Sequence, residues 1–139
     1  SHAGEKLDWM SPEQAVEGIF RHVGCSMKLA YLEDLGYEFC CGGPCAVPGP
    51  SKSAHLLYRS QDGPCVSIFM IRNTGQYGPH GPEFKPELAS STTPGGREVR
   101  QLTDGSVIFL VVGCDPRAMR PIAKRVAAAN RCIECRVDP

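Results

Sequence analysis

The stretch Ser53–Arg72, SAHLLYRSQDGPCVSIFMIR, decides the fold. Two apolar runs, Ser53–Tyr58 and Cys65–Arg72, flank the turn-forming cluster Ser60–Pro64. Runs rich in β-branched and aromatic residues on either side of a short glycine-containing loop predict an antiparallel β-hairpin. Alternate residues of the second run point to opposite faces, and both faces carry apolar groups. We therefore expect this strand to be central and covered on both sides.

A second hairpin is predicted nearer the C-terminus. The runs Arg97–Leu102 and Ser106–Gly113 flank Thr103-Asp104-Gly105, and an Asp-Gly pair between two β-like runs is a strong hairpin signal. The second run contains the uninterrupted apolar sequence VIFLVV, which is typical of a buried central strand. A last helix, Asp115–Ala129, then begins with Asp115 as its cap.

The N-terminal part predicts a helix from about Pro12 to Val23. Ser11 is a suitable N-cap, Pro12 suits the first helical position, and Gln14 completes a capping box. Apolar residues recur at helical spacing and predict one buried stripe. The members of this stripe are Val16, Ile19, Phe20 and Val23.

The regions between these elements are less regular. Met27–Leu35 is compatible with a second short helix or with an extended connector. Tyr37–Cys41 predicts a strand, Gly42–Pro44 a turn, and Cys45–Val47 a short returning strand. Asn73–Gly96 is rich in Gly, Pro, Ser and Thr, and a loop this long is functional, mobile or a family-specific insertion.

Together these elements predict an α+β fold. We expect a single antiparallel sheet of about five strands built from hairpins, with an N-terminal and a C-terminal helix packed against it. The length of 139 residues fits one domain, at 11–131, followed by a cysteine-containing tail at 132–139. Residues 1–10 are expected to be linker, and the opening Ser1–Gly4 is typical of residues left by an expression vector.

Composition narrows the classes of function. The 15 basic residues balance the 15 acidic residues, which argues against a nucleic acid as partner. No apolar run is long enough to cross a bilayer, so we expect membrane contact only through a segment absent from this chain. The eight cysteines are unusual and favour disulfides in an exported protein, or metal and thiol chemistry in a cytosolic one.

The middle and C-terminal parts resemble a known family. The segments that carry the resemblance are LGYEF at 35–39, GG at 42–43, AHLLYR at 54–59 and VSIF at 66–69, followed by the second hairpin and the last helix. This order of segments is similar to the extracytoplasmic domain of transmembrane anti-sigma factors. The long loop at 73–96 and the cysteines at 40, 41, 132 and 135 depart from that pattern. The resemblance implies a periplasmic or otherwise extracytoplasmic sensory domain whose membrane anchor lies outside this chain.

The resemblance also implies a metal site. Several relatives carry a His-x-x-Cys near the end of the first helix and a cysteine before the AHLxY strand. The matching set here is His22, Cys25, Cys45 and His55. Two imidazoles and two thiolates suit Zn, and thiolates also suit Cu(I). The alternative is that His22 interacts with the helix C-terminus, His55 is a hydrogen-bonded core residue, and the two cysteines are buried or form disulfides.

The sequence also offers a second candidate thiol site at Cys41, Cys132 and Cys135. The pairs Cys41-x-x-x-Cys45 and Cys132-x-x-Cys135 lie too far apart in sequence for a zinc ribbon, so only the fold could join them. A disulfide, or a free pair in the tail, is the competing interpretation of Cys132 and Cys135. A thiol enzyme using Cys25 and His22 lacks a third catalytic group and an oxyanion-hole signature, so we expect no enzyme activity.

The sequence thus predicts a sensory or binding domain that binds a transition metal or responds to a redox signal. The principal alternative is a disulfide-stabilised structural or interaction domain with a protein partner or a second copy of itself. Thiol counting separates the two predictions, because the first needs reduced cysteines and the second needs oxidised ones.

Overall fold

The structure is a computed structural model that describes residues 7–45, 52–73, 89–92, 98–103 and 106–136. For 89–92 and 98–103 it describes the backbone. The helices and strands, in chain order, are α1 (Pro12–His22), η1 (Glu33–Leu35), β1 (Tyr37–Pro44), β2 (Ser53–Ser60), β3 (Cys65–Arg72), β4 (Ala89–Thr92), β5 (Glu98–Thr103), β6 (Val107–Gly113) and α2 (Pro116–Ala129).

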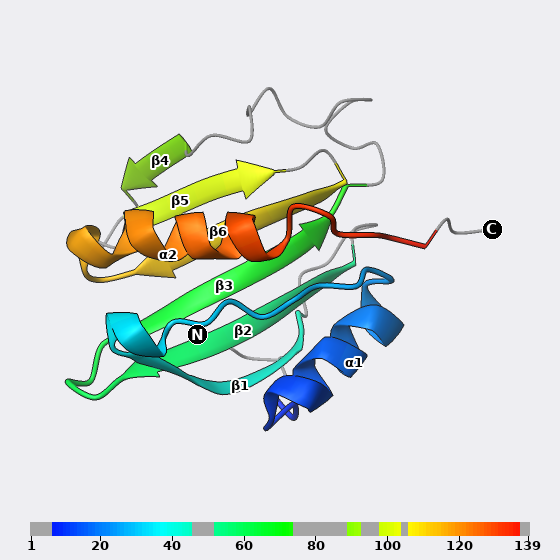
Figure 1. Cartoon of the computed structure of the whole chain (residues 1–139), viewed down its shortest axis with the longest axis horizontal. Helices are drawn as coiled ribbons and strands as arrows, with labels where there is room; N and C mark the ends of the chain where they lie inside the picture. Colours follow the sequence, from blue (N-terminus) through cyan, green and yellow to red (C-terminus); the bar gives the residue numbers. More distant parts are fainter. Residues whose placement is uncertain (1–6, 46–51, 74–88, 93–97, 104–105, 137–139) are drawn as a thin grey trace.

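The strands form one open antiparallel sheet in the order β1-β2-β3-β6-β5-β4 (Figure 1). The predicted α+β class, the single antiparallel sheet and its two flanking helices are confirmed. We expected about five strands. Side chains are described for four strands, β1, β2, β3 and β6, and the backbones of β4 and β5 extend the sheet to six. β4 falls within the segment that was expected to be loop, and it pairs with β5 at the sheet edge.

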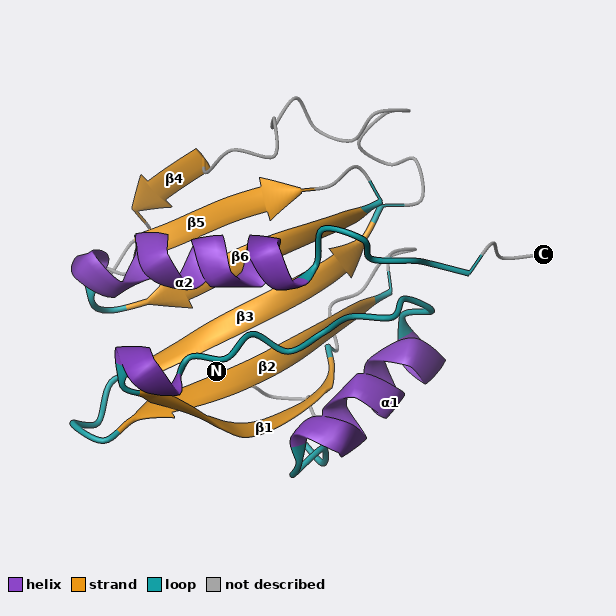
Figure 2. Ribbon diagram, viewed as in Figure 1, coloured by secondary structure: helices purple, strands orange, loops and turns teal. Residues whose placement is uncertain are grey.

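Both helices lie on the same face of the sheet (Figure 2). α1 packs on β1 and β2, and α2 packs on β5 and β6. The connector that follows α1 runs between the helices in extended form and ends in the 3₁₀ turn η1. The Tyr58 hydroxyl of β2 donates a hydrogen bond to the Ala30 carbonyl over 3.1 Å, so the connector is attached to the sheet beneath it.

The core lies between the sheet and this layer of helices and connector. Its largest fully buried side chains include Ile19 of α1, Met27 and Leu32 of the connector, Leu56, Ile68, Met70 and Phe109 of the sheet, and Met119 and Ile122 of α2. Burial of this apolar surface is the main favourable term in folding.

The other face of β3 is not covered as predicted. β3 is central, because it lies between β2 and β6, but its alternate residues Ser67, Phe69 and Ile71 are only half-buried and Cys65 is exposed. Within the described part of the chain, no helix packs on this face. Apolar residues on both faces of a strand therefore did not require two covering layers, since much of a folded protein's surface is apolar.

β1 corrects the prediction of a turn at Gly42–Pro44. The strand continues through these residues, and Gly42 pairs with Leu56 of β2. A β-carbon on Gly42 would lie 2.8 Å from the Leu56 side chain, so glycine permits a close approach rather than a turn here. The register shifts between Phe39 and Cys41, which marks a β-bulge. The short strand predicted at Cys45–Val47 lies almost entirely outside the described residues.

The helix predictions are confirmed with small shifts. The Ser11 hydroxyl accepts from the Gln14 N–H over 3.1 Å, and α1 ends one residue before the predicted Val23. Its buried face is rotated toward Ala15 and Ile19, and Phe20 is 44% exposed. α2 begins after Asp115, whose carboxylate accepts from the Arg117 N–H over 3.0 Å.

Candidate functional site: the junction of the first helix with the C-terminal tail

A disulfide joins the end of α1 to the C-terminal tail. Cys25 and Cys135 are 110 positions apart in sequence, and their Cα atoms lie 4.0 Å apart. Cys25 is fully buried. The flanking backbones form a short antiparallel bridge, in which the Ser26 N–H donates to the Glu134 carbonyl over 2.8 Å and the Arg136 N–H donates to the Gly24 carbonyl over 2.7 Å. The tail is therefore attached both covalently and through its backbone.

Two arginines satisfy carbonyls at the C-terminal end of α1. Arg136 of the tail donates to the Phe20 carbonyl over 3.1 Å and to the Arg21 carbonyl over 3.3 Å. Its guanidinium also lies 4.8 Å from the centre of the Phe20 ring. The nearly buried Arg72 of β3 donates to the Val23 carbonyl over 3.1 Å. Positive charge at a helix C-terminus is favourable because it meets unsatisfied carbonyls and the negative end of the helix dipole.

Gly24 ends α1 between these groups. Its φ of +85° lies in the left-handed region, which glycine adopts without the strain that a β-carbon causes. A β-carbon here would also lie 2.7 Å from the Arg72 guanidinium. Gly24 therefore ends the helix without strain and also makes room for the buried arginine.

Asn130 attaches the end of α2 to the connector. Its amide oxygen accepts from the Lys28 N–H over 2.8 Å, and its amide nitrogen donates to the carbonyls of Lys28, over 3.0 Å, and of Val126, over 2.9 Å. The side chain is only 4% exposed. Buried amides are stable when their donors and acceptors are paired in this way. Asn130 thus fixes the position from which the tail departs toward Cys25.

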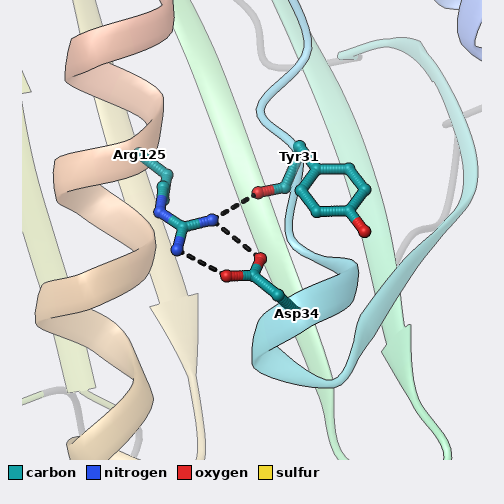
Figure 3. A network of polar contacts seen from close by, with 3 residues as sticks. All are labelled: Tyr31, Asp34 and Arg125. Carbon is teal, nitrogen blue, oxygen red and sulfur yellow. Dashed lines mark hydrogen bonds and ion pairs between the residues drawn. The ribbon is translucent and has the colours of Figure 1, made fainter.

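A more exposed contact joins α2 to η1 (Figure 3). Arg125 donates to both carboxylate oxygens of Asp34, over 2.8 and 2.6 Å, and to the Tyr31 carbonyl over 3.0 Å. The hydrogen bond from Arg125 lowers the pKa of the Asp34 carboxyl below its ordinary value. Both side chains of the ion pair remain well exposed, so the pair orients the connector but adds little to stability.

The segment before α1 is also joined to the sheet. The Trp9 N–H donates to the Gly42 carbonyl over 2.8 Å, and the Gly42 N–H donates to the Trp9 carbonyl over 2.9 Å. The indole packs against α1 so closely that a β-carbon on Gly18 would lie 2.1 Å from it. Trp9 is the single tryptophan of the chain, so its environment reports on the contact between α1 and β1.

The structure does not assemble the predicted metal ligands. His22 is exposed at the end of α1, and Cys25 is in the disulfide, so it offers no thiolate in this state. Cys45 is half-buried just after β1. His55 is fully buried in β2, where its ring stacks on Phe69 at 4.3 Å and its Nε2 lies 2.8 Å from the Ser67 hydroxyl. The environment of His55 matches the alternative of a hydrogen-bonded, buried histidine.

The second predicted thiol set is not brought together either. Cys135 is bound to Cys25, Cys132 is exposed in the turn after α2, and Cys41 lies in β1. Among the residues that the structure describes, no three His, Cys, Asp or Glu side chains are grouped so as to hold a metal ion. The Cys25–Cys135 pairing was missed because the matched motif placed Cys25 with His22, and long-range pairing cannot be inferred from spacing.

Further thiols lie on the sheet face opposite the helices. Cys41 pairs with Leu57, whose side chain points to this face, and Cys65 begins β3 on the same face. Burial, followed by hydrogen bonding and charge from the neighbouring Cys40, raises the pKa of the Cys41 thiol to about 11. The Cys25–Cys135 disulfide and the reduced thiols of Cys41 and Cys65 therefore lie on opposite sides of one sheet.

Neither a family model nor a curated protein matches this chain. No helix within the described segments is long and apolar enough to span a bilayer.

Proposed function

We propose that this chain is an extracytoplasmic sensory domain that responds to thiol redox state, similar to the ectodomains of transmembrane anti-sigma factors. The observation that carries the proposal is the Cys25–Cys135 disulfide at the junction of α1 with the tail. Disulfides with a structural role persist in oxidising compartments and are rare in the cytosol, which supports an extracytoplasmic location.

The contacts around the disulfide support a role in signalling. The tail supplies Arg136 to the last carbonyls of α1, and the disulfide holds that tail in place. Trp9 connects the segment before α1 to the helix and to the edge of β1. Reduction of the disulfide would therefore loosen the tail first, then the C-terminal end of α1, and with it the chain that enters the domain from its N-terminal side.

Cys132 provides a reaction partner within the same chain. It is exposed, reduced and three residues before Cys135. Attack by the Cys132 thiolate on the Cys135 sulfur would form a Cys132–Cys135 disulfide and release Cys25 as a thiolate, with no net oxidation. Such an exchange would detach the tail from α1 without an external reductant.

The test uses Trp9 fluorescence during reduction. In a phosphine reductant we expect the Trp9 emission to shift to the red, because loosening of α1 exposes the indole to water. The double variant Cys25→Ser/Cys135→Ser should show the shifted emission from the start and should not respond to reductant. Cys132→Ser should behave like the parent chain under reductant, since it keeps the disulfide. If mass spectrometry confirms reduction of Cys25–Cys135 and the emission does not change, the proposal fails.

The reduced chain is also the form in which a metal could be tested. Only there does Cys25 have a thiolate to join His22, Cys45 and His55 in binding Zn or Cu. Native mass spectrometry of the reduced chain with either metal, compared with Cys25→Ser, would detect metal binding at this set. Equal uptake by the two proteins would remove Cys25 from the ligands.

A second function, binding of a protein partner, is favoured by an apolar hollow beside α1. The hollow measures about 550 Å³, and Val16, Phe20 and Leu29 contribute apolar side chains to it. Phe20, Met10 and Tyr31 are large hydrophobic residues with 44%, 65% and 62% of their surface exposed. Exposed apolar surface of this kind often marks a contact site. Sedimentation analysis of the chain and of Phe20→Ser would test self-association, since a dimer through this surface should weaken in the variant.

A further inference from the structure

Two reduced cysteines lie at the adjoining ends of neighbouring strands. Cys65 is the first residue of β3, and Cys114 directly follows β6. Val66 pairs with Gly113 in the last pair of this register, so Cys65 and Cys114 each lie one residue beyond it, at the same end of the two strands. Both side chains are exposed and neither is in a disulfide.

The separation expected at this position suits a disulfide. The register of β3 and β6 shows no shift up to its last pair, Val66 and Gly113, which lies directly beside the two cysteines. Residues that face each other in antiparallel strands have Cα atoms about 4.5–5.5 Å apart, within the roughly 4.4–6.8 Å that disulfides span.

Both cysteines line a shallow hollow on the sheet face opposite the helices. The hollow measures about 390 Å³, and Leu57, Ser67 and Val112 also line it. Both cysteines are exposed in it, so a small thiol compound can reach either sulfur, and the Cys65 thiol donates to the Gly63 carbonyl over 3.7 Å. Access and proximity of a second thiol are the two features that a dithiol exchange site requires.

We propose that Cys65 and Cys114 form a dithiol site that reacts with small or protein disulfides and closes as a cross-strand disulfide. This inference rests on the proposed redox function and names its reacting partner, a disulfide, and the site at which it reacts.

The reaction balances in two steps. The thiolate of one cysteine attacks a sulfur of the incoming disulfide, the S–S bond breaks, and one thiol of the reagent leaves. The second cysteine then attacks the mixed disulfide and expels the second thiol. The two cysteines lose two protons and two electrons, and the incoming disulfide gains them as two thiols.

Cys41 is the neighbouring thiol that could compete for Cys65. One strand, β2, separates their backbone positions in the sheet, since Cys41 of β1 pairs with β2 and β2 pairs with β3. The raised pKa of Cys41, about 11, leaves it mostly protonated near neutral pH, so it is a poor attacking group. Cys114 therefore remains the favoured partner of Cys65.

The experiment treats the whole chain with oxidised glutathione and maps cysteine links by peptide mass spectrometry. We expect a Cys65–Cys114 link and no lasting glutathione on either residue. In Cys65→Ser, the adduct on Cys114 should persist, because the resolving thiol is missing, and Cys114→Ser should retain the adduct on Cys65. Cys132→Ser, which removes an exposed cysteine outside this pair, should form the Cys65–Cys114 link as the parent chain does.

Stable glutathione on both Cys65 and Cys114 of the parent chain would overturn the inference, and so would a link from Cys65 to Cys41. These results are independent of Trp9 emission. The proposed dithiol site can therefore be disproved while reduction of Cys25–Cys135 is still found to loosen α1. The experiments thus distinguish the failure of one proposal from the failure of the other.

Discussion

The two faces of the sheet contrast in how they are held and in the state of their cysteines. On the covered face, the core is closed by α1, the connector and α2, and Cys25 is fully buried in its disulfide with Cys135. On the opposite face, Ser67, Phe69 and Ile71 are half-buried, and Cys65 is exposed and reduced. Cysteine therefore occupies two environments, because Cys25 is buried in a disulfide while the exposed thiol of Cys65 is accessible to exchange.

The contrast also implies that the stability of the fold depends mainly on the covered face and thiol reactivity on the opposite face. Removal of atoms from the covered face should cost folding free energy, whereas changes on the opposite face should mainly alter thiol chemistry.

The largest effect is expected for Phe109→Ala. Phe109 is 1% exposed on the covered face of β6, so its removal leaves a cavity, and we expect the free energy of unfolding to fall by about 3–5 kcal/mol. Phe69→Ala is the matched change on the opposite face of β3, and because this side chain is only half-buried we expect a loss of about 1–2 kcal/mol. Denaturant unfolding of both variants makes the comparison, and equal losses would contradict the division between the faces.

The next-largest loss in the free energy of unfolding is expected for the Cys25→Ser/Cys135→Ser variant. The bond closes a loop spanning 110 positions, and loss of a disulfide across a loop of this size costs about 2–5 kcal/mol, mainly because the unfolded chain gains freedom. Cys65→Ser/Cys114→Ser should change the unfolding free energy of the reduced chain by less than about 0.5 kcal/mol, since both residues are exposed. A large loss in the second variant would mean that the pair on the opposite face is structural.

Arg136→Ala should have a smaller effect that is confined to the junction. The change removes two hydrogen bonds to α1 carbonyls and the contact with the Phe20 ring, and we expect a loss of about 1 kcal/mol. Arg136→Lys keeps the charge and should recover part of the loss. Thermal unfolding followed by circular dichroism measures both, and a loss in Arg136→Lys as large as in Arg136→Ala would show that charge at this helix end is unimportant.

The smallest effect is the pH dependence of the ion pair between Asp34 and Arg125. The hydrogen bond from Arg125 lowers the pKa of Asp34, so the pair stabilises the fold above the ordinary pKa of an aspartate. That contribution should disappear as the pH falls through the lowered pKa. The difference in unfolding midpoint between the parent chain and Asp34→Asn should therefore shrink on acidification. A difference that stays constant from neutral pH to pH values well below the ordinary pKa would contradict this assignment.

Local sequence signals predicted much of the fold. Ser11 and Asp115 cap the two helices as expected, and the hairpin of β2 and β3 has the predicted turn. These features depend on residues that are neighbours in sequence, where capping and turn preferences act directly. β1 was cut short because Gly42 was interpreted as a turn residue, whereas its lack of a side chain serves the approach of Leu56 and Trp9.

The site could be predicted only in part. The importance of the end of α1 was indicated by His22 and Cys25, yet the partners of this region come from the tail and from β3. Pairing between Cys25 and Cys135 depends on the path of α2, which carries the tail back across the molecule (Figure 1). The placement of Cys65 and Cys114 at adjoining strand ends depends on β3 and β6 being neighbours, which the sequence order of the hairpins does not specify.

The most direct test of the account is hydrogen exchange of the oxidised and the reduced chain, with reduction of Cys25–Cys135 verified by mass spectrometry. Reduction should speed exchange in α1 and at the Ser26 and Arg136 amides, whose hydrogen bonds form the bridge between Gly24–Ser26 and the tail. The amides of β3 and β6 should remain the most protected, because they exchange only when the whole domain unfolds. Unchanged exchange in α1 after reduction would contradict the claim that this junction holds the helix.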